Sequence, residues 1–162
     1  MMDPLKKNWI DTGRASLRFV PYVLFTPDIP TVIAADCGAP AGFFSRTSAL
    51  FSIQRAVTQA YYASPQASKS TRPDDFANQN FKAIADATGI VQRSSAAGIQ
   101  PAAAAKCVAD PQAKKLLAVR QGLARRRYGV AGTPDVTLNG RDLGTGGSWP
   151  ALENALKAAA KG

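Results

Sequence analysis

The chain has 162 residues, 46% of them apolar, and 20 basic against 11 acidic side chains give a formal net charge of +9. This length fits one domain with an inserted subdomain, and the positive charge indicates a basic, solvated surface more than a nucleic-acid partner. The sequence has no histidine and only two cysteines, which excludes Ser-His-Asp and Cys-His catalysis, histidine zinc sites and a four-cysteine zinc site.

Membrane insertion and a cleavable leader are also not expected from this sequence. No stretch of 18 apolar residues occurs, so no transmembrane helix is predicted. The charged start, Met1 to Lys7, is not followed by an apolar run, so it is not a secretory signal.

The first part of the chain predicts a helix, a strand and a loop. Residues 4–12 are predicted to form a short helix that Gly13 ends. Apolar and polar residues alternate over 15–20, which predicts a strand ending before Pro21. Three prolines over 21–30 indicate a loop.

The middle of the chain is predicted to be helical. The expected helices are 29–37, 41–55, a helix from Asp74 or Asp75 to Ala87, and 100–107, with a polar loop at 64–73. Either aspartate is a suitable N-cap for the third helix, and Gly89 is its expected end. The side chains expected to point inward from this segment are Phe76, Phe81, Ile84 and Ala85.

A long helix is predicted from Pro111, after the N-cap Asp110, to Tyr128. Leu116, Val119 and Leu123 recur at i, i+3 and i+7 and predict its buried face. The arginines of residues 125–127 lie at the helix C-terminus, where the helix dipole favours positive charge, so no nucleic acid is needed to explain them.

The C-terminal part predicts a hairpin and a closing helix. Strand 135–138 and a partner near 141–143 flank the turn Asn139-Gly140. Ser148 is the expected N-cap of a final helix, 149–160, with Leu152 and Leu156 on its buried edge.

The string from Tyr128 to Gly140 resembles the cis-proline segment of thioredoxin-fold proteins, with Gly132-Thr133-Pro134 as its turn. The passage from Leu5 to Arg14 and the segments around Cys37 and Cys107 narrow the resemblance to the DsbA-like thiol:disulfide oxidoreductases. The resemblance implies an α/β, thioredoxin-like fold, incomplete at the N-terminus, with an inserted helical subdomain. The implied divisions are 1–25 for the first part of the core, 26–128 for the subdomain and 129–162 for the rest of the core.

The same resemblance implies thiol:disulfide interchange on exported proteins in the periplasm, without a cofactor. Thr133 and Pro134 are implied to bind unfolded or extended protein substrates through the backbone. A redox partner protein is implied for a full-length form, whereas no nucleic acid is expected.

The family works through a Cys-x-x-Cys pair, and these 162 residues contain none. We therefore expect that the chain begins downstream of the catalytic pair and is inactive by itself, with no catalytic residue and no metal site. If Met1 is the true start, the absence of an export signal favours the cytoplasm. The alternatives are a redox-inactive thioredoxin-like binding module and, third, a basic nucleic-acid-binding domain.

Cys37 and Cys107 lie too far apart in the sequence to be that catalytic pair. The resemblance implies a structural disulfide between them, like a second, non-catalytic bridge in some family members. The alternative is two buried free thiols, because a free cysteine behaves as a small apolar residue.

The family places a further strand between the strands matching 15–20 and 135–138. Without it, we expect either two unpaired edges and marginal stability, or direct pairing of these two strands.

Overall fold

The computed structural model describes residues 2–69, 72–145 and 148–160, and the chain divides into two compact units. The helical unit is Tyr22–Gln121, and the composite unit joins Met1–Pro21 to Gly122–Gly162. These bounds differ from the expected divisions at 25 and 128, because the second boundary falls inside the long helix α8 (Pro111–Tyr128).

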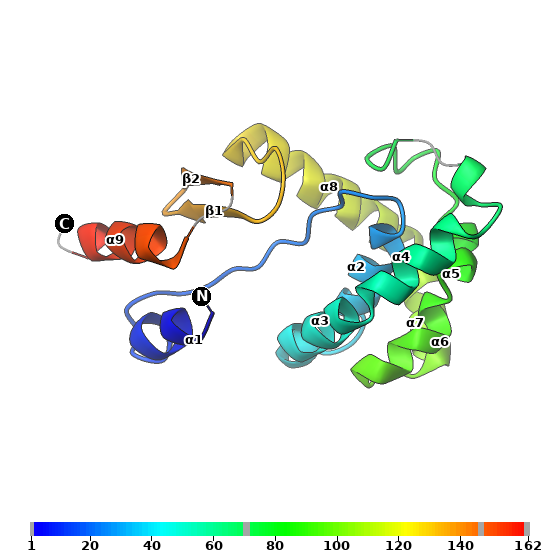
Figure 1. Ribbon diagram of the computed structural model, residues 1–162, viewed down its shortest axis with the longest axis horizontal. Coiled ribbons are helices and arrows are strands. Elements are labelled where there is room, and N and C mark those ends of the chain that lie inside the picture. Colours follow the sequence, from blue (N-terminus) through cyan, green and yellow to red (C-terminus); the bar gives the residue numbers. More distant parts are fainter. Residues whose placement is uncertain (1, 70–71, 146–147, 161–162) are drawn as a thin grey trace. The chain divides into compact units, whose positions relative to one another are not determined.

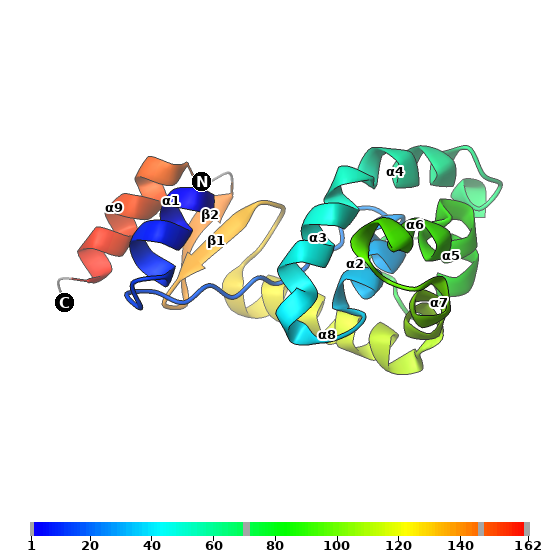
Figure 2. The ribbon, with the colours of Figure 1, turned by 90° about the horizontal axis from the view of Figure 1, so that it is seen from below.

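The helical unit is built around α2 (Asp28–Asp36), which contacts α3, α5, α6 and α7 and lies among them in Figure 2. Ile29, Ile33 and Ala34 of α2 are buried, so this short helix supplies the centre of the core. The remaining elements before α8 are η2 (Pro40–Gly42), α3 (Phe43–Ser52), α4 (Gln54–Tyr62), η3 (Ala67–Lys69), α5 (Phe81–Thr88), α6 (Ile90–Arg93), η4 (Ser94–Ala97) and α7 (Pro101–Ala109).

The helices predicted over 29–37 and 100–107 are confirmed as α2 and α7. The helix predicted over 41–55 is interrupted at Ile53 and continues as α4 to Tyr62. Part of the polar loop predicted at 64–73 forms η3, and its residues 70–71 lie outside the described part of the chain.

The predicted cap at Asp74 or Asp75 is wrong, because α5 begins after Asn80. The Asn80 side chain accepts the N–H of Ala83 at 3.0 Å and so satisfies the helix N-terminus. The two aspartates bind other side chains, Arg72 and Asn78 respectively. The predicted end at Gly89 is confirmed, with φ at +63°, and the four side chains predicted inward (Phe76, Phe81, Ile84, Ala85) are all buried.

Helix α8 has the predicted bounds but not the predicted buried face. Leu116, Val119 and Leu123 are 45%, 49% and 45% exposed. The side chains that the helix buries are instead Leu117, Gln121 and Ala124. The spacing of apolar residues alone therefore selected the wrong side of a helix whose orientation is set by tertiary contacts.

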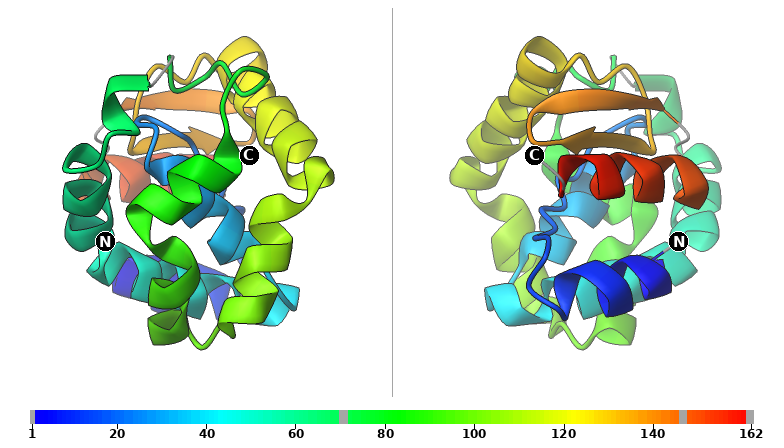
Figure 3. Two further views of the ribbon diagram at one scale, coloured as in Figure 1. Left: turned by 90° about the vertical axis from the view of Figure 1, so that its right-hand side faces the viewer. Right: turned by 90° about the vertical axis from the view of Figure 1, so that its left-hand side faces the viewer.

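The composite unit contains α1 (Met2–Leu5), the π-helix η1 (Lys6–Ile10), a two-stranded antiparallel sheet and α9 (Trp149–Ala159). Its buried cluster comprises Leu5, Trp9, Leu152 and Leu156. The N-terminal helices and α9 therefore pack together, with the hairpin beside α9 (Figures 1 and 3). The predicted closing helix is confirmed, with the Ser148 side chain accepting the N–H of Ala151.

The predicted hairpin is confirmed as β1 (Asp135–Leu138) and β2 (Arg141–Thr145). Thr137 lies opposite Asp142, and a register shift occurs between Asp135 and Thr137. Asn139 and Gly140 have φ of 51° and 81°, as a tight Asn-Gly hairpin turn requires.

The strand predicted over 15–20 is wrong, because these residues form no regular secondary structure. The alternative of direct pairing between 15–20 and 135–138 is also wrong, since the described part of β1 pairs only with β2. A segment with alternating apolar residues forms a strand only when a neighbouring strand hydrogen-bonds to its backbone N–H and C=O groups.

Candidate functional site

Thr133 and Pro134 lie exposed immediately before β1, joined by a cis peptide bond. In the residues that the structure describes, β2 occupies one edge of β1 and no strand occupies the other. An open strand edge presents backbone N–H and C=O groups to an incoming extended segment. The geometry therefore allows a peptide to add to the sheet at the start of β1.

The electrostatic feature of this site is the carboxyl group of Asp135, the first residue of β1. Partial loss of hydration raises its pKa, and so do the negative charge of Asp142 on β2 and a hydrogen bond shared with it. A bond from the Val136 N–H acts in the opposite direction. Asp142 is itself held by the Gly144 N–H, which donates to its Oδ1 at 2.7 Å.

Apolar side chains are also exposed on the extended segment 15–20 of the same unit. Leu17, Phe19 and Val20 are 37%, 42% and 41% exposed. Ala15, by contrast, packs against the buried cluster of the unit. This unit therefore presents both an open strand edge and uncovered apolar surface.

The two cysteines lie in the helical unit and form a disulfide, so the structure does not have the two free thiols of the alternative interpretation. Cys37 follows α2, Cys107 lies in α7, and their Cα atoms are 5.9 Å apart. The disulfide therefore links the end of α2 to α7 within the helical unit. It belongs to a different unit from Thr133 and Pro134.

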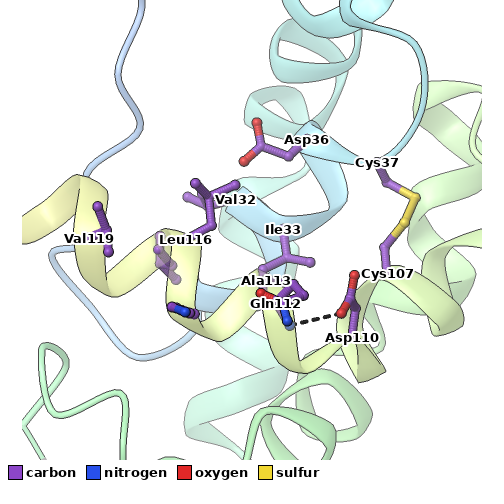
Figure 4. Close-up of a pocket in the computed structure, with 12 residues that line it drawn as sticks. Val32, Ile33, Asp36, Cys37, Cys107, Asp110, Gln112, Ala113, Leu116 and Val119 are labelled. Atoms are coloured by element: carbon purple, nitrogen blue, oxygen red, sulfur yellow. Dashed lines mark hydrogen bonds between the residues drawn. A yellow bond between two sulfur atoms is a disulfide. The ribbon is translucent and has the colours of Figure 1, made fainter.

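A pocket of about 490 Å³ lies beside this disulfide, between α2 and the first half of α8 (Figure 4). Its walls are largely apolar, and Asp36, Asp110 and Lys115 are its charged side chains. Asp36 is paired with Arg120, and Asp110 accepts the N–H of Gln112 at 2.8 Å. The apolar walls are formed chiefly by Val32, Ile33, Ala113, Leu116, Leu117 and Val119.

Sequence reasoning missed this pocket because it assigned Leu116 and Val119 to the core. It also missed Gln121, a buried polar side chain that binds the backbone of Val23 twice. The Gln121 Oε1 accepts the Val23 N–H at 2.9 Å, and the Nε2 donates to the Val23 carbonyl at 3.0 Å. No local sequence signal marks a partner so far away along the chain.

Asp28 binds the backbone of the two residues that follow Val23. Its Oδ2 accepts the N–H groups of Leu24 and Phe25. Burial raises the pKa of this carboxyl, and the two backbone bonds oppose that rise.

Within the described ranges, no helix combines the length and the apolar content that a membrane span requires.

Comparisons with known proteins give a family and a fold. A family model described as thioredoxin matches residues 1–158. A crystal structure of a protein-disulfide isomerase from Novosphingobium aromaticivorans is similar at a TM-score of 0.78 and 21% identity, covering 99% of this chain and 82% of that chain. Curated protein sequences give no match.

Proposed function

The chain belongs to the thioredoxin family and has a thioredoxin-like fold with inserted helices, and from that premise we propose that it serves thiol:disulfide interchange on exported proteins. Its own part in that chemistry is to bind an extended substrate segment at Thr133 and Pro134. The observation that carries this proposal is the exposure of these two residues at a strand with an open edge. An extended segment adds there by main-chain hydrogen bonds.

The family's interchange uses a Cys-x-x-Cys pair, and the two cysteines of these 162 residues lie 70 positions apart in the sequence. In thiol:disulfide interchange a thiolate attacks a disulfide, and a second cysteine resolves the mixed disulfide. We propose that a Cys-x-x-Cys pair preceding this sequence supplies both groups in the native protein, together with an export signal and periplasmic location. A redox partner protein then returns the cysteine pair to its starting oxidation state after each turnover.

The second candidate is a redox-inactive binding module that uses the same edge. Binding at this edge involves backbone groups at Thr133 and Pro134 and so needs no thiol. The two candidates differ in the mass of the native protein. An intact mass several kilodaltons above 17.0 kDa, with four cysteines, supports interchange, whereas a mass near 17.0 kDa with two cysteines supports the binding module.

Substitutions at Thr133 test the binding step common to both. Thr133→Pro removes the backbone N–H that would donate to a peptide, whereas Thr133→Ala keeps it and removes only the side chain. Loss of one such bond is worth about 1 kcal/mol, so the proline variant binds an unstructured peptide about fivefold more weakly. The alanine variant serves as the matched control and keeps most of the affinity.

Binding is measured by fluorescence anisotropy with a labelled, reduced and alkylated peptide, after both variants are shown to melt near the parent temperature. Equal affinity of the two variants and the parent would remove Thr133 from the site. The proposal would then lose its main support.

A further inference from the structure

The disulfide of the helical unit is not sealed inside the core, because both of its cysteines line the pocket between α2 and α8 (Figure 4). Their exposure is unequal. Cys37 is only 7% exposed, whereas Cys107 is half-buried. Of the two residues, Cys107 is therefore the more accessible.

The side chains that line the pocket also favour one chemical class of ligand. Its lining is dominated by aliphatic side chains, and two of its three charged groups are carboxylates. A volume of about 490 Å³ is within the usual range for small-molecule sites. These walls favour a neutral apolar molecule over an anionic one, because an anion would lose hydration against the aliphatic side chains.

We propose that this pocket is a thiol-exchange site, in which a small neutral apolar thiol forms a mixed disulfide with Cys107. The bound thiol gives its proton to water, its sulfur attacks the Cys107 Sγ as the thiolate, a new sulfur–sulfur bond forms, and the Cys37–Cys107 bond breaks. The electron pair leaves on the Cys37 Sγ, which takes a proton from solvent. Attack is set by which sulfur is accessible, and here access favours Cys107.

The surroundings of Cys37 suit the thiol that the exchange leaves on this residue. Its Sγ lies 3.5 Å from the Ala103 carbonyl oxygen, within reach of a thiol S–H donor. Exchange therefore leaves a buried Cys37 thiol with an acceptor and a ligand held on Cys107 in the pocket. The inference is independent of the proposed function, because Thr133 and Pro134 take no part in it.

The test uses the full oxidised chain without denaturant and two thiols of similar thiol pKa, phenylmethanethiol and 2-mercaptoethanesulfonate. Samples are acid-quenched over time, and the adduct is located by peptide mass mapping. We expect a rate that rises with thiol concentration until the pocket is occupied, an adduct on Cys107, and a preference of about tenfold for the apolar thiol, as burial of part of its ring predicts.

Three outcomes would overturn the inference: a rate that is the same at every thiol concentration tested, which would mean that unfolding limits it; an adduct on Cys37; or equal rates for the two thiols. Pocket variants give an independent readout. Ala113→Leu places a larger side chain in the pocket and slows exchange several-fold, whereas Ala118→Leu, exposed on the same helix and outside the pocket, leaves it unchanged. Melting temperatures of both variants show that the fold is retained.

Discussion

The helical unit and the composite unit differ in the size of the buried apolar cluster that each contains. The helical unit buries a cluster drawn from α2 to α8 and closes it with a disulfide. The composite unit has a smaller buried cluster, formed by Leu5, Trp9, Leu152 and Leu156, and it leaves Leu17, Phe19 and Val20 exposed. Stability is thus concentrated in one unit, and the open binding edge lies in the other.

The largest test of this contrast removes the disulfide by replacing Cys37 and Cys107 with alanine together. Closing a loop of this length contributes about 4 kcal/mol in the chain-entropy model. We expect the free energy of unfolding of the helical unit to fall by about that amount, measured by urea denaturation with segment-resolved hydrogen exchange. A loss of stability confined to the composite unit would contradict the expectation that the disulfide stabilises the helical unit.

The next largest loss of stability is expected when a buried side chain of either unit is truncated. Ile84 is fully buried in the helical unit, so Ile84→Ala is expected to cost about 3 kcal/mol through lost burial and a cavity. Leu152→Ala makes the matched change in the smaller cluster of the composite unit. Hydrogen exchange should show the first variant weakening α2, α5 and α7, and the second weakening α9. Identical exchange patterns would mean that the units unfold as one.

Replacing Gln121 probes the link between the ends of the helical unit. Gln121→Leu leaves the Val23 N–H and carbonyl without their side-chain partner, which costs about 2 kcal/mol. Gln54→Leu, at an exposed position, is the control and should stay within about 0.5 kcal/mol of the parent. A Gln121 variant as stable as the control would show that the two bonds are not needed.

The smallest effect is the pH dependence from Asp28. Its folded-state pKa is raised by burial, so its contribution to stability is present below its unfolded pKa of about 3.9 and is lost as pH rises through the folded value. The stability of the parent relative to Asp28→Asn should therefore fall as pH rises from the unfolded pKa of about 3.9 through the raised folded pKa. Chemical denaturation at several pH values measures this difference, and a difference that grows with rising pH would have the wrong sign.

Local signals predicted part of this fold well. The bounds of α8, the Ser148 cap and the Asn139-Gly140 turn follow from caps and turn residues, whose effects act within a few residues. The thioredoxin-like fold itself is confirmed by the family and structural comparisons.

The errors concern features that depend on distant partners. The alternation over 15–20 predicted a strand, yet a strand needs a neighbour that sequence periodicity does not supply. Helix α8 turns its polar Gln121 inward because Val23 offers two backbone groups, while Leu116 and Val119 face the pocket. At the candidate site, the sequence predicted Thr133 and Pro134 but not the raised pKa of the Asp135 carboxyl, which loses hydration and lies near Asp142.

The most direct test of the central claim is amide hydrogen exchange of the full chain with and without an unstructured peptide. We predict that the amides of the helical unit exchange more slowly than those of the composite unit without peptide. Added peptide should then slow exchange from Thr133 to Leu138 and leave α2, α5 and α7 unchanged. Equal protection of both units, or peptide-induced protection confined to the helical unit, would contradict the division between a stable helical unit and an open binding edge.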